Sequence, residues 1–226
     1  MSETLNGWTI VFDLDGTLVN TAPDLLDALN HVLTHADLSP VTLDTIETMI
    51  GRGARAMIVQ GLQTHGITPS EADLDAFFDQ FIAYYADHLA DNSHPFDGAV
   101  PALEALAAKG AILAVCTNKT QALTDRLLQA LGLSHHFAAI VGADSVPRRK
   151  PDGDHILRTV RAAGGEPART VMIGDSRTDE RAARNAGLPF IFVPFGYEEE
   201  SPDQLKPDVV LTHYSELVSV LEDWVS

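Results

Sequence analysis

Four aspartates and one lysine in this chain could together handle a phosphate group. Asp13 and Asp15 belong to one Asp-Leu-Asp-Gly-Thr run, Asp175 and Asp179 lie together much later, and Lys150 lies between the two pairs. Two carboxylates about 4 Å apart repel by roughly 4 kcal/mol at an effective dielectric near 20. Carboxylates that converge therefore need a cation or protons. Oxygen ligands suit Mg²⁺, and an ammonium group suits a phosphoryl oxygen.

Each of these segments is a weak signal alone. An Asp-x-Asp-Gly run is a common turn, and this one lacks the third acidic ligand that a calcium loop needs. Thr117-Asn118 after an apolar run is typical of a helix cap. Lys150 follows Arg148 and Arg149, so it could belong to a solvated basic patch. The segments become informative together, because each follows a predicted strand or lies in the adjoining loop.

The elements that would position these residues are short apolar runs separated by helical patterns. The runs do not alternate, which is typical of strands buried on both faces. Strand and helix in turn predict a parallel sheet wrapped by helices, whose ligands bind at the carboxyl ends of the strands. The predicted strands are Trp8–Phe12, Ala111–Cys116, Ala138–Val141, Thr170–Ile173, Phe190–Val193 and Asp208–Leu211.

One region departs from this rhythm. From Thr21 to about Asn92 the apolar residues repeat at helical spacing and no strand pattern is visible. We therefore expect an α/β core domain made of residues 1–19 and 96–226. A helical domain of residues 20–95 would be inserted after the first strand.

Charge and cysteine content limit the classes of binding partner and of covalent cross-link that we expect. The formal net charge of −17 disfavours nucleic acid and anionic membrane surfaces as partners. The single cysteine, Cys116, rules out an intrachain disulfide and lies in an apolar run, which favours a buried thiol. No signal peptide or membrane-spanning run is visible, so we expect a cytoplasmic protein, as a monomer or homodimer. Glu198–Glu200 predicts a solvated loop.

The ordered set of motifs resembles the haloacid dehalogenase-like hydrolases over essentially the whole chain. The motifs are Asp13-Leu14-Asp15-Gly16-Thr17, Thr117-Asn118, Lys150-Pro151, and Gly174-Asp175-Ser176 with Asp179. The resemblance implies a Rossmann-like parallel sheet core with helices on both faces and an inserted all-helical cap domain. It also implies a Mg²⁺-dependent enzyme that acts on a small phosphorylated metabolite.

The resemblance assigns roles to individual residues. Asp13 would be the nucleophile that forms an aspartyl-phosphate, and Asp15 would be the general acid and then the general base. Lys150 would hold the phosphate and orient Asp13. Thr117 and Asn118 would hold phosphoryl oxygens. Mg²⁺ would be bound by Asp13, by the backbone carbonyl of Asp15 and by Asp175. Ser176 and Asp179 would support the metal site.

Within the family the chain is most similar to the phosphoglycolate phosphatases. The similar segments are Phe12–Val19, Thr21–Leu25, Gly51–Arg55, Cys116–Lys119, Val146–Asp152 and Phe195–Tyr197, whereas Gly153-Asp154 stands where relatives often carry another proline.

This similarity implies 2-phosphoglycolate as substrate and predicts that Gly51, Arg52 and Gly53 bind it. Arg52 or Arg55 would pair with the substrate carboxylate. A pyrophosphatase, a sugar-phosphate phosphatase and a phosphomutase stay open as alternatives. Asp15 and Asp175 disfavour a dehalogenase, and the complete set of motifs disfavours a non-catalytic regulator.

Overall fold

The chain folds into two compact units. The computed structural model describes residues 5–197 and 201–225, so the prediction for Glu198–Glu200 lies outside the described residues. One unit combines Met1–Val19 with Pro95–Ser226, and the other is Asn20–His94.

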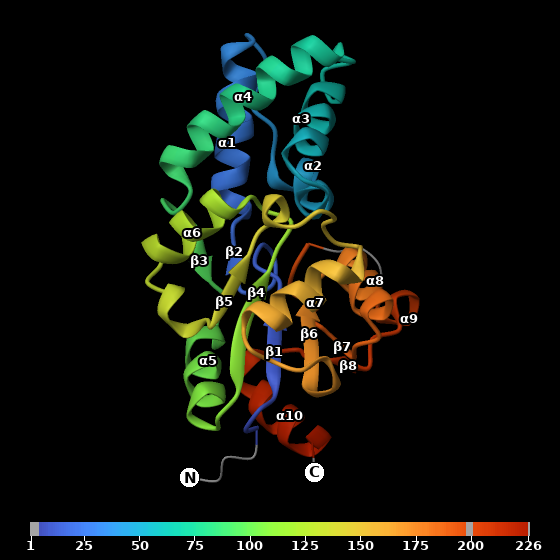
Figure 1. Ribbon diagram of the computed structural model, residues 1–226. Coiled ribbons are helices and arrows are strands. Elements are labelled where there is room, and N and C mark those ends of the chain that lie inside the picture. The colour runs from blue at the N-terminus through green and yellow to red at the C-terminus, as the bar shows by residue number, and fades with distance from the viewer. Residues whose placement is uncertain (1–4, 198–200, 226) are drawn as a thin grey trace. The chain divides into compact units, whose positions relative to one another are not determined.

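The first unit is built on a six-stranded parallel sheet with the order β5-β4-β1-β6-β7-β8 (Figure 1). The parallel sheet predicted from the apolar runs is confirmed, and each predicted strand boundary is within one residue of the observed one. The strands are β1 (Thr9–Phe12), β4 (Ile112–Cys116), β5 (Ala139–Val141), β6 (Thr170–Gly174), β7 (Phe190–Phe192) and β8 (Val209–Val210).

The register of the three central strands brings their carboxyl ends to one level. Phe12 of β1 is aligned with Val115 of β4 and with Ile173 of β6. The next backbone amide, that of Asp13, still donates to the carbonyl of Ile173 at 2.9 Å. The polar residues that follow these strands therefore emerge at a single edge of the sheet.

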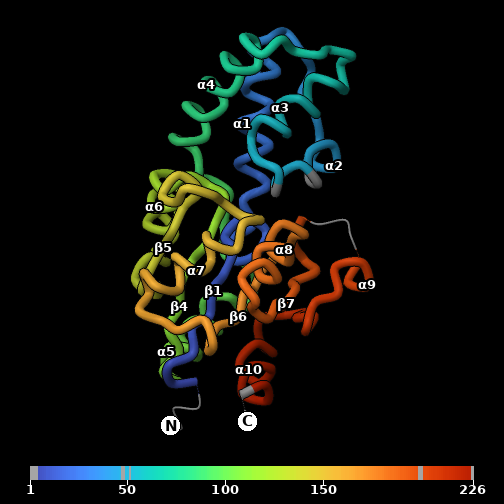
Figure 2. Tube along the Cα trace, turned by 45° about the vertical axis from the view of Figure 1, so that its right-hand side comes forward, coloured from blue at the N-terminus to red at the C-terminus, as the bar shows by residue number. Residues whose placement is uncertain are grey.

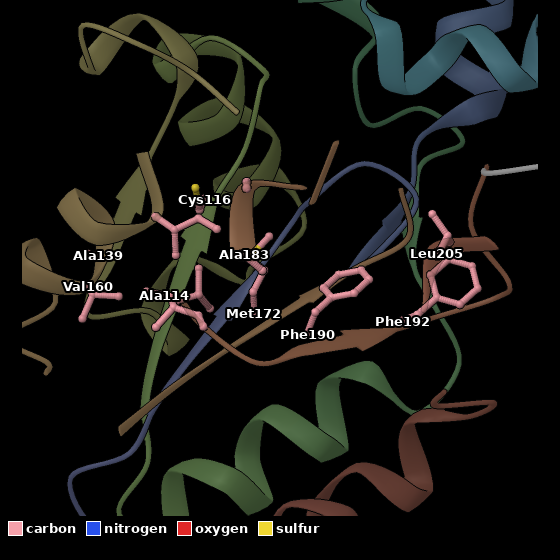
Figure 3. Packing of buried hydrophobic residues seen from close by; sticks show 13 residues of the cluster. Ala114, Cys116, Ala139, Val160, Met172, Ala183, Phe190, Phe192 and Leu205 are labelled. Atoms are coloured by element: carbon pink, nitrogen blue, oxygen red, sulfur yellow. The ribbon is translucent and has the colours of Figure 1, made fainter. Parts of the chain in front are cut away.

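The strands β1, β6 and β7 are buried at every residue and therefore on both faces, which explains why their sequences do not alternate. On one face, side chains such as Val11, Met172 and Phe190 pack against α7 (Gly153–Ala162) and α8 (Arg177–Ala186) (Figure 3). Figure 2 shows α7 and α8 side by side. Cys116 lies in this cluster as a buried free thiol, as predicted.

The other helices complete the α/β unit. α5 (Ala99–Ala108) contacts β4 and α10 (Leu217–Val225), while α6 (Gln121–Ala130) contacts β5. A short α9 (Pro202–Leu205) precedes β8. The helix α8 ends at Gly187, whose φ of 70° is the left-handed conformation expected of a glycine stop.

The second unit is helical. Its elements are α1 (Ala22–His35), α2 (Leu43–Ile46), the 3₁₀ helix η1 (Glu47–Arg52), α3 (Ala54–Gln63) and α4 (Glu71–His88). Leu29, Val32, Phe81 and Tyr85 are buried in its core. The predicted all-helical insert is thus observed.

Two short strands, β2 (Val19–Asn20) and β3 (His94–Pro95), pair where the chain enters and leaves the helical segment. The sequence gives no signal for either strand, because a two-residue strand has no periodicity to detect.

Candidate active site

The loop after β1 turns sharply and brings Asp13 and Asp15 to the edge of the sheet. Gly16 has a φ of +82°, and a Cβ atom placed there would lie 2.4 Å from Oδ2 of Asp175. The turn is closed by a hydrogen bond from the amide of Gly16 to the carbonyl of Val19 at 3.0 Å. Glycine is therefore required here both for its backbone conformation and for the close approach of Asp175.

Three carboxylates converge at this edge. One oxygen from each of Asp13, Asp175 and Asp179 lies within 4.8 Å of the other two. Burial, followed by the charge of Asp179, raises the pKa of Asp13 to about 7. Burial, followed by the charges of Asp179 and Asp13, raises the pKa of Asp175 well above its ordinary value. The protein alone therefore does not stabilise the fully ionised cluster.

Lys150 supplies the only positive charge inside the cluster among the described residues. Its Nζ lies 2.8 Å from Oδ1 of Asp13 and 2.6 Å from Oδ1 of Asp179. Burial alone would lower the pKa of Lys150, but the charges of Asp13 and Asp179 outweigh burial and raise it. The Lys150 side chain is 1% exposed, whereas that of Arg148 is 69% exposed, so Lys150 is not part of a solvated basic patch.

The backbone of Lys150 is held on both sides. Its amide donates to Nδ1 of His155 at 3.2 Å, and its carbonyl accepts from Nδ2 of Asn118 at 3.0 Å. Burial and the charge of Lys150 lower the pKa of His155 to about 4, so its imidazole is neutral and Nδ1 is free to accept. Asn118, expected to hold a phosphoryl oxygen, thus also fixes Lys150.

Asp175 is held by two donors that the sequence analysis did not assign. Oγ1 of Thr17 donates to Oδ1 at 2.7 Å, and the backbone amide of Tyr197 donates to Oδ2 at 2.9 Å. Thr17 closes the first acidic motif, and Tyr197 belongs to the Phe-Gly-Tyr run, so both had a sequence signal but no assigned role. A Cβ atom at Gly196 would lie 2.2 Å from Cβ of Asp175, so glycine is needed there as well.

Asp179 is fully buried and already occupied on both oxygens. Oδ2 accepts from Oγ of Ser176 at 2.6 Å and from the Ser176 amide at 3.2 Å. The Asp179 amide donates back to Oγ of Ser176 at 3.3 Å, which completes a capping box at the start of α8. Oδ1 accepts from Lys150. Asp179 therefore divides its two oxygens between Ser176 and Lys150, whereas both donors to Asp175 are uncharged.

The remaining predicted core residues lie in the same region. Thr117 is 1% exposed, and its Oγ1 accepts from the amide of Lys119 at 3.1 Å. Asp13 contacts Lys150, whereas the carboxylate of Asp15 contacts Lys119: both Asp15 oxygens accept from Nζ of Lys119. Sequence reasoning gave Lys119 no role.

The donor set fits a divalent cation. Asp13, Asp175 and Asp179 carry three negative charges when ionised, and Lys150 offsets only one of them. Carboxylate oxygens are the hard ligands that Mg²⁺ prefers, and a bound Mg²⁺ would keep these carboxylates ionised at neutral pH.

The predicted substrate-binding segment belongs to the helical unit. Gly51 and Arg52 end the 3₁₀ helix η1, and Gly53 adopts a φ of 93° just before α3. Arg52 is exposed. Arg55 is exposed as well, but it pairs with Asp75 and lies over the ring of Phe78, 5.1 Å from its centroid. Of the two arginines considered, Arg52 is therefore the better candidate to meet a substrate.

The fold and the site define a class of enzyme core: a Rossmann-like parallel sheet with a helical insert, and carboxylates paired with lysines at the strand ends. The sequence profile of the haloacid dehalogenase-like hydrolases matches residues 10–193. The chain belongs to this family.

Named relatives cover almost the whole chain. It is 48% identical to a "Phosphoglycolate phosphatase" of Caulobacter vibrioides, over 92% of this chain and 87% of the relative. It is 45% identical to a "Phosphoglycolate phosphatase" of Agrobacterium fabrum, over 93% and 91%. The crystal structure of a "predicted phosphoglycolate phosphatase" from Haemophilus somnus is similar with a TM-score of 0.88 and 31% identity, over 96% of this chain and 98% of that one.

No helix in the described part of the chain has both the length and the hydropathy needed to cross a bilayer.

Proposed function

We propose that this protein is a Mg²⁺-dependent phosphatase that hydrolyses 2-phosphoglycolate to glycolate and inorganic phosphate. The observation that carries the proposal is the convergence of Asp13, Asp175 and Asp179 around Lys150 at the carboxyl edge of the sheet. The names of the relatives supply the substrate.

The first half of the reaction transfers the phosphoryl group to the protein. A carboxylate oxygen of Asp13 attacks phosphorus, and the bond from phosphorus to the ester oxygen breaks. Asp15 gives its proton to the departing oxygen, which leaves as the hydroxyl of glycolate. Lys150 and Thr117 bind phosphoryl oxygens, and the positive charge of Lys150 stabilises the negative charge that gathers there.

The second half returns the protein to its starting state. Asp15, now a carboxylate, takes a proton from water, and the water oxygen attacks phosphorus. The bond between phosphorus and the Asp13 oxygen breaks, which releases inorganic phosphate and restores the carboxylate. One residue serves as acid and then as base because the proton demand reverses between the two halves.

Asp13, the backbone carbonyl of Asp15 and Asp175 would hold the metal ion, with Ser176 and Asp179 behind them. When bound, Mg²⁺ supplies charge neutralisation and Lewis acidity toward the phosphoryl oxygens. Thr17 and the amide of Tyr197 orient Asp175 for this role through their hydrogen bonds to its two oxygens.

The helical segment, residues 20–95, would act as a cap domain that selects the leaving group. Gly51, Arg52 and Gly53 would contact the substrate, and the guanidinium of Arg52 would pair with the carboxylate of 2-phosphoglycolate. The ion pair of Arg55 with Asp75 supports Arg52 as the residue that pairs. We further propose a cytoplasmic protein, monomeric or homodimeric, without nucleic acid or membrane partners.

A substrate panel tests the proposal. Purified protein is assayed for phosphate release from 2-phosphoglycolate, a sugar phosphate and pyrophosphate, with Mg²⁺ and after EDTA. We expect the highest kcat/KM for 2-phosphoglycolate, loss of activity in EDTA and recovery on adding Mg²⁺. Turnover that survives EDTA would contradict the metal site. A higher kcat/KM for the sugar phosphate or for pyrophosphate would support phosphatase activity but would show that 2-phosphoglycolate is not the preferred substrate.

A further inference from the structure

The site contains a second lysine that the proposed reaction leaves without a role. Nζ of Lys119 lies 2.9 Å from Oδ1 and 3.1 Å from Oδ2 of Asp15, so one ammonium group contacts both carboxylate oxygens. The side chains of Lys119 and Asp15 are only 7% and 18% exposed. Solvent screens such a pair far less than it screens an ion pair on the surface.

The backbone of Lys119 is fixed independently of this ion pair. Its amide donates to Oγ1 of Thr117 at 3.1 Å, and its carbonyl accepts from the amide of Ala143 at 2.9 Å. A Cβ atom at Gly142 would lie 2.9 Å from that carbonyl oxygen, so the neighbouring loop packs tightly against it. The main chain of Lys119 is therefore anchored, and its ammonium group can hold the Asp15 carboxylate in one orientation.

The two lysines divide the carboxylates between them. Lys150 pairs with Asp13 and Asp179, whereas Lys119 pairs with Asp15. Each of the two aspartates that take part in bond making thus has its own cation. In addition, Asp15 loses a proton to the leaving oxygen, and an ammonium about 3 Å away stabilises the charge that this transfer leaves behind.

We propose that Lys119 is a positioning residue for Asp15: it holds the carboxyl group in the orientation that delivers a proton to the leaving oxygen. The inference rests on the proposed function, because it assumes that Asp15 is the general acid. It makes a prediction that a purely structural ion pair does not. The loss of kcat/KM on replacing Lys119 should be large for esters whose leaving group needs a proton and small for esters whose leaving group does not.

The test compares three esters with different leaving groups. Ethyl phosphate and 2-phosphoglycolate release alkoxide-like oxygens that need a proton, whereas p-nitrophenyl phosphate releases a stable anion that needs none. The quantity measured is kcat/KM, because it reports only the steps up to phosphorylation of Asp13. The ratio of kcat/KM for two esters on one preparation is also independent of the fraction of folded protein.

We expect Lys119→Met to lower kcat/KM for ethyl phosphate and 2-phosphoglycolate by about 100-fold, the usual scale of general acid catalysis, and for p-nitrophenyl phosphate far less. Lys119→Arg keeps a charged donor and should restore much of the loss. Lys109→Met is the matched control: Lys109 pairs with Glu222 at 2.6 Å in the same unit, and its loss should leave all three esters unchanged.

The pairing with Asp15 is tested by a double-mutant cycle. Asp15→Asn should show the same selective loss, and adding Lys119→Met to it should cost little more, because the carboxylate that Lys119 is proposed to position is already gone. Fully additive losses would overturn the inference.

The other outcomes are distinct. Equal losses for all three esters would mean that Lys119 contacts the phosphate or only supports the fold. A loss confined to 2-phosphoglycolate would mean that it binds the substrate carboxylate. Either result overturns the inference. Wild-type protein that releases phosphate from none of the esters would instead refute the proposed function.

Discussion

Asp24 in the helical unit and the site aspartates Asp13, Asp175 and Asp179 in the α/β unit are all largely buried, but their surroundings are opposite. Asp24 is 1% exposed and accepts three hydrogen bonds, from the amide of Asn92 at 2.9 Å, the amide of Ser93 at 2.8 Å and Oγ of Ser93 at 2.6 Å. It also lies in the first turn of α1, where the helix dipole favours a negative charge.

Asp13 and Asp175 face each other and Asp179 across less than 4.8 Å. Their surroundings raise the pKa of both carboxyl groups, of Asp13 to about 7. Burial alone therefore does not tell a structural carboxylate from a reactive one. The difference lies in what surrounds it: hydrogen-bond donors at Asp24, and other acceptors with a single ammonium at Asp13.

The largest expected effect concerns turnover. Asp13→Asn removes the attacking oxygen's charge, and we expect kcat for 2-phosphoglycolate to fall on the order of 10⁴-fold or more, as when other nucleophiles are removed. The far-ultraviolet circular dichroism should stay unchanged, because the amide relieves repulsion without creating a cavity. Asp223→Asn, an exposed change on α10, is the matched control. Retained turnover in Asp13→Asn would show that a different group attacks phosphorus.

The second prediction concerns the free energy of unfolding, which should respond differently at Asp24 and at Asp175. Asp24→Ala leaves two amides and a hydroxyl group without an acceptor, which should lower the free energy of unfolding by about 3–5 kcal/mol. Asp175→Asn should not lower it in the absence of metal, because it removes one of three repelling charges. With Mg²⁺ at about 100 times its Kd, the wild type should gain about 2.7 kcal/mol and Asp175→Asn almost nothing.

Urea unfolding followed by two signals measures these changes. Circular dichroism reports both units, whereas Trp8 and Trp224 report only the α/β unit. The comparison between the two kinds of carboxylate would fail if Asp24→Ala and metal-free Asp175→Asn were destabilised equally.

The sequence predicts the fold well because its signals are local. Each strand is a short apolar run with a helix stop such as Gly187 nearby, and chain order alone places Asp13, Asp175 and Lys150 at one edge of the sheet. The motifs also identify the family. The short strands β2 and β3 give no such signal.

The positioning contacts could not be predicted in the same way. The donors to Asp175 are Thr17 and Tyr197, which are 158 and 22 residues away in the chain. His155 has no sequence mark of its contact with the Lys150 amide, and the pairing of Lys119 with Asp15 spans 104 residues. Which acceptor each donor meets depends on the register of the sheet and the path of the loops, and neither is encoded locally.

The smallest predicted effect concerns His155, which is neutral because burial and Lys150 lower its pKa from 6.5 to about 4. Between these two pH values the unfolded chain binds a proton that the folded chain does not. The contribution of His155 to stability is therefore complete above pH 6.5 and is lost as the pH falls toward 4. The expected loss between pH 7 and pH 5 is about 2 kcal/mol.

The carboxylates of the site act with the opposite sign, since the raised pKa of Asp13 costs stability as the pH rises toward 7. The comparison of wild type with His155→Gln cancels that contribution, because both proteins keep the cluster. Glutamine can still accept from the Lys150 amide but does not titrate in this range. In metal-free urea unfolding, His155→Gln should lose about 2 kcal/mol less than the wild type between pH 7 and pH 5, while the exposed control His135→Gln should behave like the wild type. Equal losses in all three proteins would mean that the folded chain does not hold His155 neutral in this pH range.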